Sequence, residues 1–219
     1  MTSAEQPSIS NLPRIRLPVP RHARRDVSLF EALERRRTIR QISSAPISLQ
    51  TLSDLLWAAC GVNRTDGPFG VTGRTAASAS NSQEIDVYVA MRDAVYRFDA
   101  LDLELAPVAN GDLRGYAMTP DQRDANADIP VQLIYVADIH RLTHTRGFRE
   151  PGLHDVETQK AYYYVDAGMI SENVYLFCAG EGLAAWFHNC DKTALALRLG
   201  LREDQRVLFA QSVGYPENV

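Results

Sequence analysis

The first stretch with residue types suited to chemistry is Arg36-Arg37-Thr38-Ile39-Arg40, which gathers three guanidinium groups and one hydroxyl within five residues. In an extended chain Arg36, Thr38 and Arg40 project to one side. That arrangement can surround a phosphate with charge-assisted, bidentate hydrogen bonds. The alternative is a solvated basic face, which is common for runs of arginine. The run alone leaves both interpretations open.

A second polar stretch, Arg74–Glu84, offers hydroxyl and amide groups but no suitable general base. Amide side chains present a donor and an acceptor together, as recognition of the edge of a planar heterocycle requires. The stretch ends a loop, residues 61–84, that is rich in Gly, Ser, Thr and Asn and longer than a typical connection. Long ordered loops are often functional, although a polar turn without a ligand is the alternative.

Together and in this order, the two stretches resemble the cofactor-binding segments of the nitroreductase family of FMN enzymes. In that family an Arg-Arg-Ser-x-Arg-like run binds the FMN phosphate and pyrimidine edge, and a Pro-Ser-x-x-Asn-x-Gln-like loop binds the ribityl chain and ring. Here Thr38 replaces the serine and Ala77 replaces the proline. The resemblance assigns FMN contacts to Arg36, Arg37, Thr38, Arg40, Ser78, Asn81 and Gln83.

Further segments extend the resemblance over about residues 27–216: Leu55–Gly61, Asp166 to Leu183, and Val213–Pro216. In the family, the segment after the Gly-Leu pair of the long helix passes beside the flavin, and its backbone N–H contacts flavin N5. This segment corresponds to Phe187, His188, Asn189 and Cys190. Because the flavin carries the chemistry, no side chain is required as the catalyst. His188 is either a proton carrier or a structural histidine.

One departure from the family pattern lies after Gly214-Tyr215-Pro216, where many relatives carry a basic residue and this chain has Glu217. Phosphate binding would therefore depend more heavily on Arg36 and Arg40. The loop Arg64–Arg74 looks like that of the branch containing the azoline-oxidising dehydrogenases of peptide maturation, the SagB type. This likeness leaves the substrate open.

The resemblance implies an α+β fold, a three-layer α-β-α sandwich with a central, mainly antiparallel sheet. It also implies an intertwined homodimer with one FMN at each of two subunit interfaces. Hydride would pass from NADH or NADPH through flavin N5 to a nitroaromatic, quinone or similar acceptor. One alternative is a flavin-dependent dehydrogenase that oxidises an azoline or other small substrate. Another is a non-catalytic binder of anions or nucleic acid that uses the cluster Arg14–Arg40.

Four helices are expected to position these residues. The first opens with the capping-box pattern of Ser28 and Glu31, should bury Phe30 and Leu33, and runs into the arginines. The third is apolar around much of its circumference, so we expect it to be buried on more than one side and to end at Gly180. The predicted ranges are 28–37, 48–61, 157–179 and 191–199, the last ending at Gly200.

Short apolar runs predict the strands. Ile85–Met91 and Ala94–Phe98 should form a hairpin across Arg92-Asp93, and Leu101–Val108 could add an edge strand. Val131–Ala137 suits a central strand and Val207–Val213 the last one. Residues 138–156 are expected to form a second long polar loop.

The composition fits one packed domain. Of 219 residues, 45% are hydrophobic and 23% charged. We expect an FMN-binding domain at 27–219 after an extended, proline-containing arm at 1–26. The net charge of −4 counts against nucleic-acid binding, and no apolar run is long enough to span a membrane. Three cysteines without CxxC spacing indicate neither disulfides nor a metal site. A cytoplasmic homodimer acting on a small molecule is the expectation.

Overall fold

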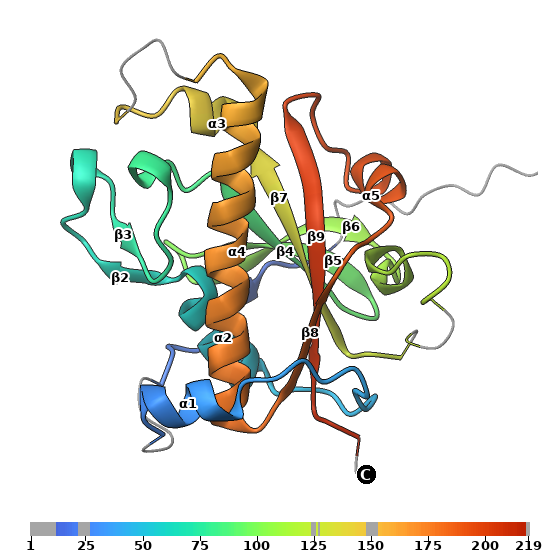
Figure 1. Cartoon of the computed structure of the whole chain (residues 1–219). Helices are drawn as coiled ribbons and strands as arrows, with labels where there is room; N and C mark the ends of the chain where they lie inside the picture. Colours follow the sequence, from blue (N-terminus) through green and yellow to red (C-terminus); the bar gives the residue numbers. More distant parts are fainter. Residues whose placement is uncertain (1–11, 22–26, 124–125, 127, 148–152, 218–219) are drawn as a thin grey trace, which may run out of the picture.

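The computed structural model describes residues 12–21, 27–123, 126, 128–147 and 153–217. Helices and strands of this α+β chain alternate irregularly along the sequence (Figure 1). In chain order, with η for 3-10 helices, they are β1 (Ile15–Arg16), α1 (Leu29–Arg35), α2 (Leu49–Cys60), β2 (Val62–Arg64), η2 (Pro68–Gly70), β3 (Gly73–Arg74), η3 (Ala79–Asn81), β4 (Ile85–Ala90), β5 (Ala94–Asp99), β6 (Glu104–Asn110), η4 (Arg114–Ala117), β7 (Val131–Asp138), α3 (Ile139–Thr143), α4 (Val156–Glu181), β8 (Ala184–His188), α5 (Lys192–Arg198) and β9 (Gln205–Gly214).

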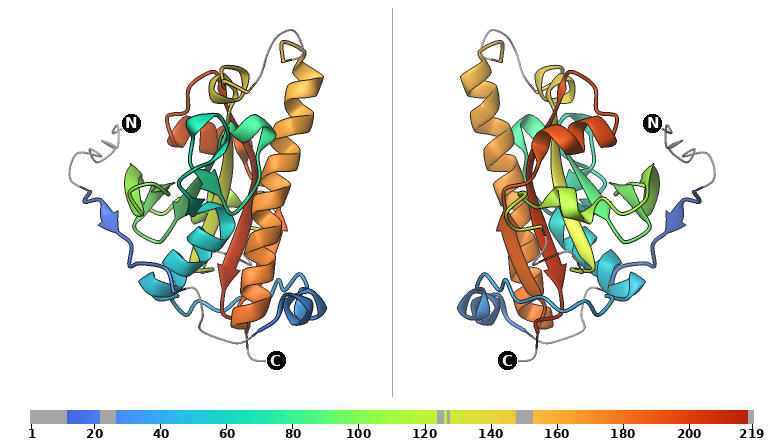
Figure 2. Two further views of the ribbon diagram at one scale, coloured as in Figure 1. Left: turned by 90° about the vertical axis from the view of Figure 1, so that its left-hand side faces the viewer. Right: turned by 90° about the vertical axis from the view of Figure 1, so that its right-hand side faces the viewer.

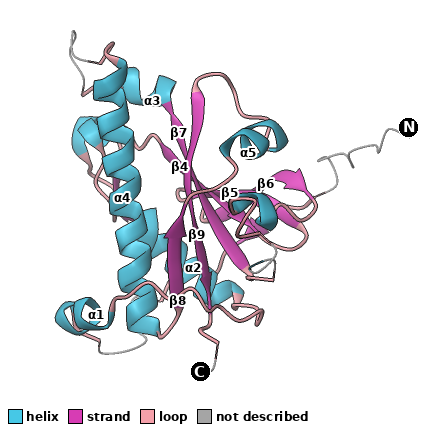
Figure 3. Cartoon of the chain, turned by 45° about the vertical axis from the view of Figure 1, so that its right-hand side comes forward, coloured by secondary structure: helices cyan, strands magenta, loops and turns pink. Residues whose placement is uncertain are grey.

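A seven-stranded sheet forms the middle of the molecule, in the order β1-β6-β5-β4-β7-β9-β8. Each pair of neighbouring strands is antiparallel. The predicted hairpin of β4 and β5 is confirmed, with Ala90 opposite Val95. The long helix α4 crosses one face of the sheet together with α2, while α5 and η4 lie on the other face (Figures 1 and 3). The three-layer architecture with a mainly antiparallel sheet is therefore confirmed.

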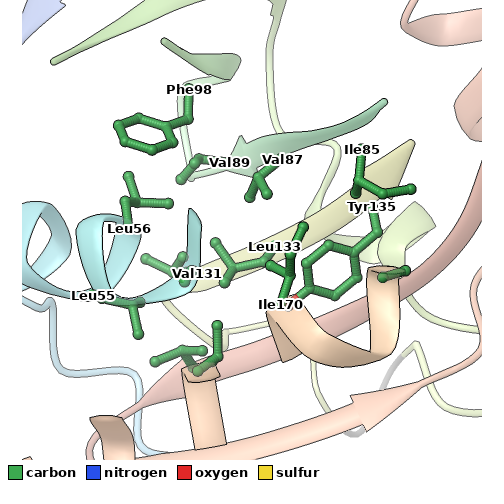
Figure 4. Close-up of a cluster of buried hydrophobic side chains, with 14 of the residues drawn as sticks. Leu55, Leu56, Ile85, Val87, Val89, Phe98, Val131, Leu133, Tyr135 and Ile170 are labelled. Atoms are coloured by element: carbon green, nitrogen blue, oxygen red, sulfur yellow. The ribbon is translucent and has the colours of Figure 1, made fainter. Parts of the chain in front are cut away.

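Alternation along the central strands divides the core between the two faces. In β7, Leu133 and Tyr135 face α2 and α4, whereas Ile134 faces α5, and all three are fully buried. Figure 4 shows Leu55 of α2 and Ile170 of α4 beside the first of these faces. Burying each such side chain stabilises the fold by roughly 1.5–3 kcal/mol. Because both faces of β7 are covered, its sequence is apolar apart from Gln132 and the terminal Asp138, as expected for a central strand.

The described part of the predicted arm, residues 12–21, lies on its own chain (Figure 2). Its strand β1 pairs with β6, and Leu17 is buried in the main core. The hydroxyl of Ser53 donates to Pro18 O, and the backbone N–H of Arg21 donates to the Asp54 carboxylate. Strand β6 is therefore not the edge strand that was expected. Residues 1–11 and 22–26 of the arm lie outside the described residues.

Two expectations about helix burial are wrong for the single chain. Helix α1 begins after Ser28, whose side chain accepts from the Glu31 N–H as predicted. Phe30 is nevertheless 79% exposed and Leu33 48% exposed, because α1 contacts α4 through its opposite side. Helix α4 likewise leaves Val165 and Met169 exposed. A band of apolar side chains on α1 and α4 is thus open to solvent.

The end of α4 also differs from the prediction, which placed it at Gly180. The helix continues to Glu181, and Gly182 adopts a left-handed backbone with φ of 71°. This turn lets the Leu183 N–H donate to Cys178 O at 2.8 Å, which closes the helix end. Gly180 has an ordinary helical backbone, so its position near the end of the periodic pattern was misleading.

Strand β8 and helix α3 were not predicted. The short segment Ala184–His188 follows α4 so closely that its apolar residues extend the helical pattern. Helix α3 lies within the polar region 138–156 and is capped by the Asp138 side chain. None of the helices in the described ranges has the length and apolar content needed to cross a bilayer.

Candidate functional site

The arginine run follows α1 in an extended conformation and lies beside the first residues of β8. The Ile39 N–H donates to Ala185 O at 3.0 Å, and the Ile39 side chain packs against a small core cluster. Thr38 and Arg40 are exposed and Arg36 is half-buried. The extended conformation expected from the sequence is therefore present.

Two aromatic rings support the guanidinium groups of this run. Arg36 Cζ lies 5.6 Å from the centre of the Tyr175 ring, and Arg40 Cζ lies 5.6 Å from the centre of the Trp186 ring. No carboxylate of the described residues forms an ion pair with Arg36, Arg37 or Arg40. Cations that are held in place and not neutralised are suited to bind an anion.

Tyr175 of α4 joins the arginine run to β8. Its hydroxyl accepts a hydrogen bond from the Phe187 N–H at 2.8 Å and lies 3.2 Å from Thr38 Oγ1. The ring is 9% exposed, so these polar contacts are shielded from water. Sequence reasoning missed Tyr175, because nothing in its helical context distinguishes it from a core residue.

The four residues assigned to the segment beside the flavin alternate between two faces. Phe187 is half-buried and Asn189 exposed, whereas His188 and Cys190 are buried. Phe187 belongs to an open aromatic cluster, with its ring centre 4.8 Å from that of Phe209. A planar ligand beside this segment would therefore meet Phe187 and Asn189, and not the side chains of the other two.

His188 and Cys190 point into the layer between the sheet and α5. His188 Nε2 lies 2.8 Å from Ser212 Oγ and Nδ1 lies 2.9 Å from Asn189 O, so both ring nitrogens have partners. Burial lowers the pKa of His188, which favours the neutral ring. Burial raises the pKa of the Cys190 thiol to about 12, so it is not a thiolate near neutral pH. These environments are those of structural residues.

In the loop assigned to ribityl and ring binding, residues 78–83, most polar side chains are bonded to the preceding segment 68–74 or to each other. The Asn81 amide donates toward the carbonyl groups of the segment 68–72, and the Gln83 amide donates to Thr72 O at 2.6 Å. Gln83 Oε1 accepts from Arg74 Nε, and Ser78 Oγ accepts from the Gln83 N–H. A ligand at this loop would therefore contact mainly its backbone and its outer surface.

The backbone of this loop is strained. Ser80, Asn81 and Gln83 have φ values of 48°, 55° and 51°, in the left-handed region that residues with a Cβ rarely adopt. Each such residue costs on the order of 1–3 kcal/mol and persists only where the surroundings enforce it. From below, Asp166 of α4 accepts the Ala79 N–H at 2.8 Å and Glu84 accepts the Ser82 hydroxyl at 2.6 Å.

Within one chain, the arginine run and the loop are on different sides of α4. Asp166, which holds the loop, and Tyr175, which holds the run, stand nine positions apart on α4, about 13 Å along its axis. In Figure 1, β3, which leads into the loop, lies to the left of α4 and β8 lies to its right. The single chain therefore does not bring the two predicted halves of the site together.

The segment after β9 lies against the residues that follow Arg40. The Ser43 N–H donates to Tyr215 O and the Glu217 N–H donates to Gln41 O. The position where a basic residue was expected from the family pattern thus lies next to the arginine run, and Glu217 is exposed there.

The donors of the described residues fit FMN in chemical type. Three guanidinium groups without carboxylate partners suit a phosphate, and the half-buried ring of Phe187 with the exposed amide of Asn189 suits a planar ring. Arg36 and Phe187 lie on the α4 face of β8, whereas Arg40 contacts Trp186, whose ring packs against His188 on the opposite face. The polar loop, on the other side of α4, offers an open outer surface at Ala77.

Comparisons with known proteins agree with this fold and donor set. The model of the nitroreductase family matches residues 33–215. A protein from Methanocaldococcus jannaschii described as a nitroreductase is 27% identical over 168 residues, 72% of this chain and 76% of the relative. A crystal structure of a protein from Ralstonia eutropha, also described as a nitroreductase, has 31% identity and a TM-score of 0.80, covering 94% of this chain and 90% of that one.

A more distant structure shares the fold alone. The NADPH:FMN oxidoreductase of Vibrio harveyi, solved with NAD⁺, is 17% identical, with a TM-score of 0.58 over 87% of this chain and 69% of that chain. The family model covers most of the chain, and the Ralstonia structure extends the agreement to almost its full length. The chain therefore belongs to the nitroreductase family, a family of oxidoreductases.

Proposed function

We propose that this protein is an FMN-dependent oxidoreductase that transfers hydride from NADH or NADPH to a nitroaromatic, quinone or similar small acceptor. FMN, when bound, supplies the N5 position that accepts and donates the hydride. The observation that carries the proposal is the set of guanidinium groups of Arg36, Arg37 and Arg40, which form no ion pair with the described residues and lie beside the aromatic side chains of β8. The family match supports the same function.

In this proposal the residues of the chain bind the FMN phosphate, orient the ring and place fixed dipoles beside it. Arg36 and Arg40 bind the phosphate. Thr38 also binds it, and the contact with the Tyr175 hydroxyl holds the Thr38 side chain in place. The backbone of Phe187–Cys190 would lie beside the ring with an N–H directed toward N5, where a fixed dipole would support the change in hydrogen bonding that reduction brings. His188 and Cys190 maintain the backbone of this segment from behind, and neither needs to react.

The site is completed by a second copy of the chain. The apolar band on α1 and α4 supports this inference, with Phe30 79%, Val165 55% and Met169 42% exposed. Several large apolar side chains left exposed on neighbouring helices are typical of protein interfaces. A partner that covers the band would bring its loop 78–83 toward the arginine run of the first chain, which joins the two halves that α4 separates.

The phosphate assignment is tested by titrating FMN into purified protein. Replacement of Arg36 and Arg40 by Ala should weaken FMN binding at least a hundredfold, because each charge-assisted hydrogen bond contributes about 1.5–3 kcal/mol. The charge-matched control replaces Arg35 and Arg92, two exposed arginines that pair with Glu31 and Asp128. Equal affinity in both double variants would remove the arginine run from the site.

The two-chain site is tested with hybrid dimers. One chain carries the Arg36→Ala and Arg40→Ala substitutions, and the other carries Ala77→Trp at the exposed edge of the loop. If each site takes its arginine run and its loop from different chains, the hybrid has one intact site and binds one FMN per dimer, although neither parent homodimer binds any. A hybrid that binds no FMN would place both halves in one chain.

Two other functions remain as outcomes of reduction experiments. An FMN-loaded protein that NADH and NADPH both fail to reduce would favour a dehydrogenase that oxidises an azoline or another small substrate. A protein that binds no FMN and retains nucleic acid in a salt-dependent manner would favour the binding module based on Arg14–Arg40.

A further inference from the structure

Two buried carboxyl groups lie beneath the strained loop 78–83. Glu84, just before β4, is fully buried, and Asp166 of α4 is 4% exposed. Glu84 Oε2 accepts the Ser82 hydroxyl and Asp166 Oδ2 accepts the Ala79 N–H, so the pair holds the η3 turn near both of its ends. The two carboxyl groups also lie close enough together to interact directly.

Two carboxyl groups this close can hydrogen-bond to each other only when one of them carries a proton. Glu84 Oε1 receives no donor from the described residues. Two negative charges in contact in a buried site are strongly unfavourable. The last proton of the pair is therefore retained to unusually high pH. Burial, followed by the Asp166 charge, raises the pKa of Glu84 to about 7, and burial also raises that of Asp166.

The charged neighbours do not neutralise the pair. Arg141 of α3 donates to the backbone carbonyl of Glu84 and forms its ion pair with Asp86. Arg74 donates to Gln83 Oε1 and Cys60 O. A cavity of about 190 Å³ borders Asp166 and the loop, and its charged lining residues are Arg74, Asp86, Arg97, Asp99, Arg141 and Asp166. Arg141 and Arg74 are thus engaged by other acceptors.

Because the loop is strained, its conformation depends on support from the two carboxyl groups. Three left-handed residues within four positions need continuous support, and this support comes from below through Ala79 and Ser82. If both carboxyl groups ionise, they repel each other and separate, and at least one of these contacts is lost. The loop then relaxes from its strained backbone.

We propose that Glu84 and Asp166 are positioning residues that share one proton and, in that state, hold the loop 78–83 in its FMN-binding conformation. The link to FMN rests on the function proposed above, whereas the shared proton does not. The expected consequence is loss of FMN affinity as the pair ionises, because only the fraction of protein with the held loop binds.

Substitution by amides separates this role from simple packing. In Glu84→Gln the amide has the shape of the protonated carboxyl and donates to Asp166 at every pH. The variant should therefore bind FMN at high pH more tightly than the natural protein does. A residue that only filled space would show no such gain. Asp166→Asn should act likewise, because its amide can donate to an ionised Glu84.

The first test measures FMN dissociation constants by flavin fluorescence at pH 6 and pH 8 with the full chain. A group that titrates near pH 7 and binds only when protonated weakens binding about tenfold over this interval. Ionisation of the FMN phosphate is common to all variants, so the ratio to Glu84→Gln isolates the pair. The matched control is Glu172→Gln, which changes an exposed carboxylate on α4, the helix that carries Asp166. This variant should leave the pH profile of FMN binding unchanged. Equal pH profiles in Glu84→Gln and the natural protein would overturn the proposal.

The second test needs no flavin. Infrared difference spectra of the flavin-free protein should contain a band of a protonated carboxyl that disappears near neutral pH and is missing in Glu84→Gln. Absence of this band from the natural protein would refute the shared proton. If the band is present and no FMN binds at any pH, the proposed function fails while the carboxyl pair stands.

Discussion

Replacement of Tyr175 by Phe tests whether one hydroxyl joins the phosphate-binding run to the segment beside the ring. The hydroxyl accepts the Phe187 N–H at 2.8 Å and lies 3.2 Å from Thr38 Oγ1, and the side chain is 9% exposed. Its removal leaves the Phe187 N–H without this acceptor, at a cost of about 1–3 kcal/mol. The free energy of unfolding in urea should fall by that amount.

The same substitution should weaken FMN binding. Without the hydroxyl, Thr38 loses its anchor to α4, and the run must be ordered when the phosphate binds. A cost of about 1.4 kcal/mol corresponds to a tenfold higher dissociation constant, which FMN fluorescence titration resolves. The control is Tyr96→Phe, a buried tyrosine on β5 whose hydroxyl makes no hydrogen bond to the described residues. If Tyr175→Phe matches this control in both stability and FMN affinity, the joining role is wrong.

Three further predictions concern charge and assembly. Burial raises the pKa of Glu84 from 4.5 to about 7. The protonated carboxyl therefore contributes its full share to the free energy of unfolding below pH 4.5, and this contribution is lost as the pH rises to about 7. The loss amounts to about 3 kcal/mol, and urea unfolding at pH 5 and pH 8 should show that Glu84→Gln lacks it. Glu217→Lys, next to the residues that follow Arg40, should tighten FMN binding several-fold at low salt and little at high salt, and an equal effect at both would contradict a charge mechanism. Val165→Glu, on the exposed face of α4, should convert a dimer into a monomer in analytical ultracentrifugation, and an unchanged dimer would move the interface elsewhere.

Local sequence signals predicted most of the elements. Ser48 and Asp191 cap α2 and α5 through their side chains, and Gly200 ends the latter with φ of 61°. Such signals act over a few residues, so they can be read without knowledge of the fold. The apolar run of β7 was equally readable, because both of its faces are covered.

Burial of helix faces could not be read in the same way. Phe30 and Val165 have the spacing of core residues, yet both are exposed in the single chain. A hydrophobic pattern records that a surface is covered, but not whether the same chain covers it. The prolines of the arm were misleading in the opposite sense, because residue Leu17 between them reaches the core.

The candidate site was predicted by residue type but not by orientation. The arginine run lies where a phosphate could reach it, whereas Asn81 and Gln83 direct their amides into their own loop. Hydrogen bonds between segments far apart in sequence decide such orientations, and a motif does not encode them. The contacts of Tyr175 and the pairing of Glu84 with Asp166 are of the same kind, since each joins residues more than ten positions apart.

The most direct test of the account is the visible absorption spectrum of the protein with FMN, after removal of free flavin, before and after anaerobic addition of NADPH or NADH. We expect retained flavin absorption with about one FMN per chain, and bleaching by at least one nicotinamide. A colourless protein that retains no FMN would contradict the central claim. Retained flavin that neither nicotinamide bleaches would contradict the proposed hydride donor.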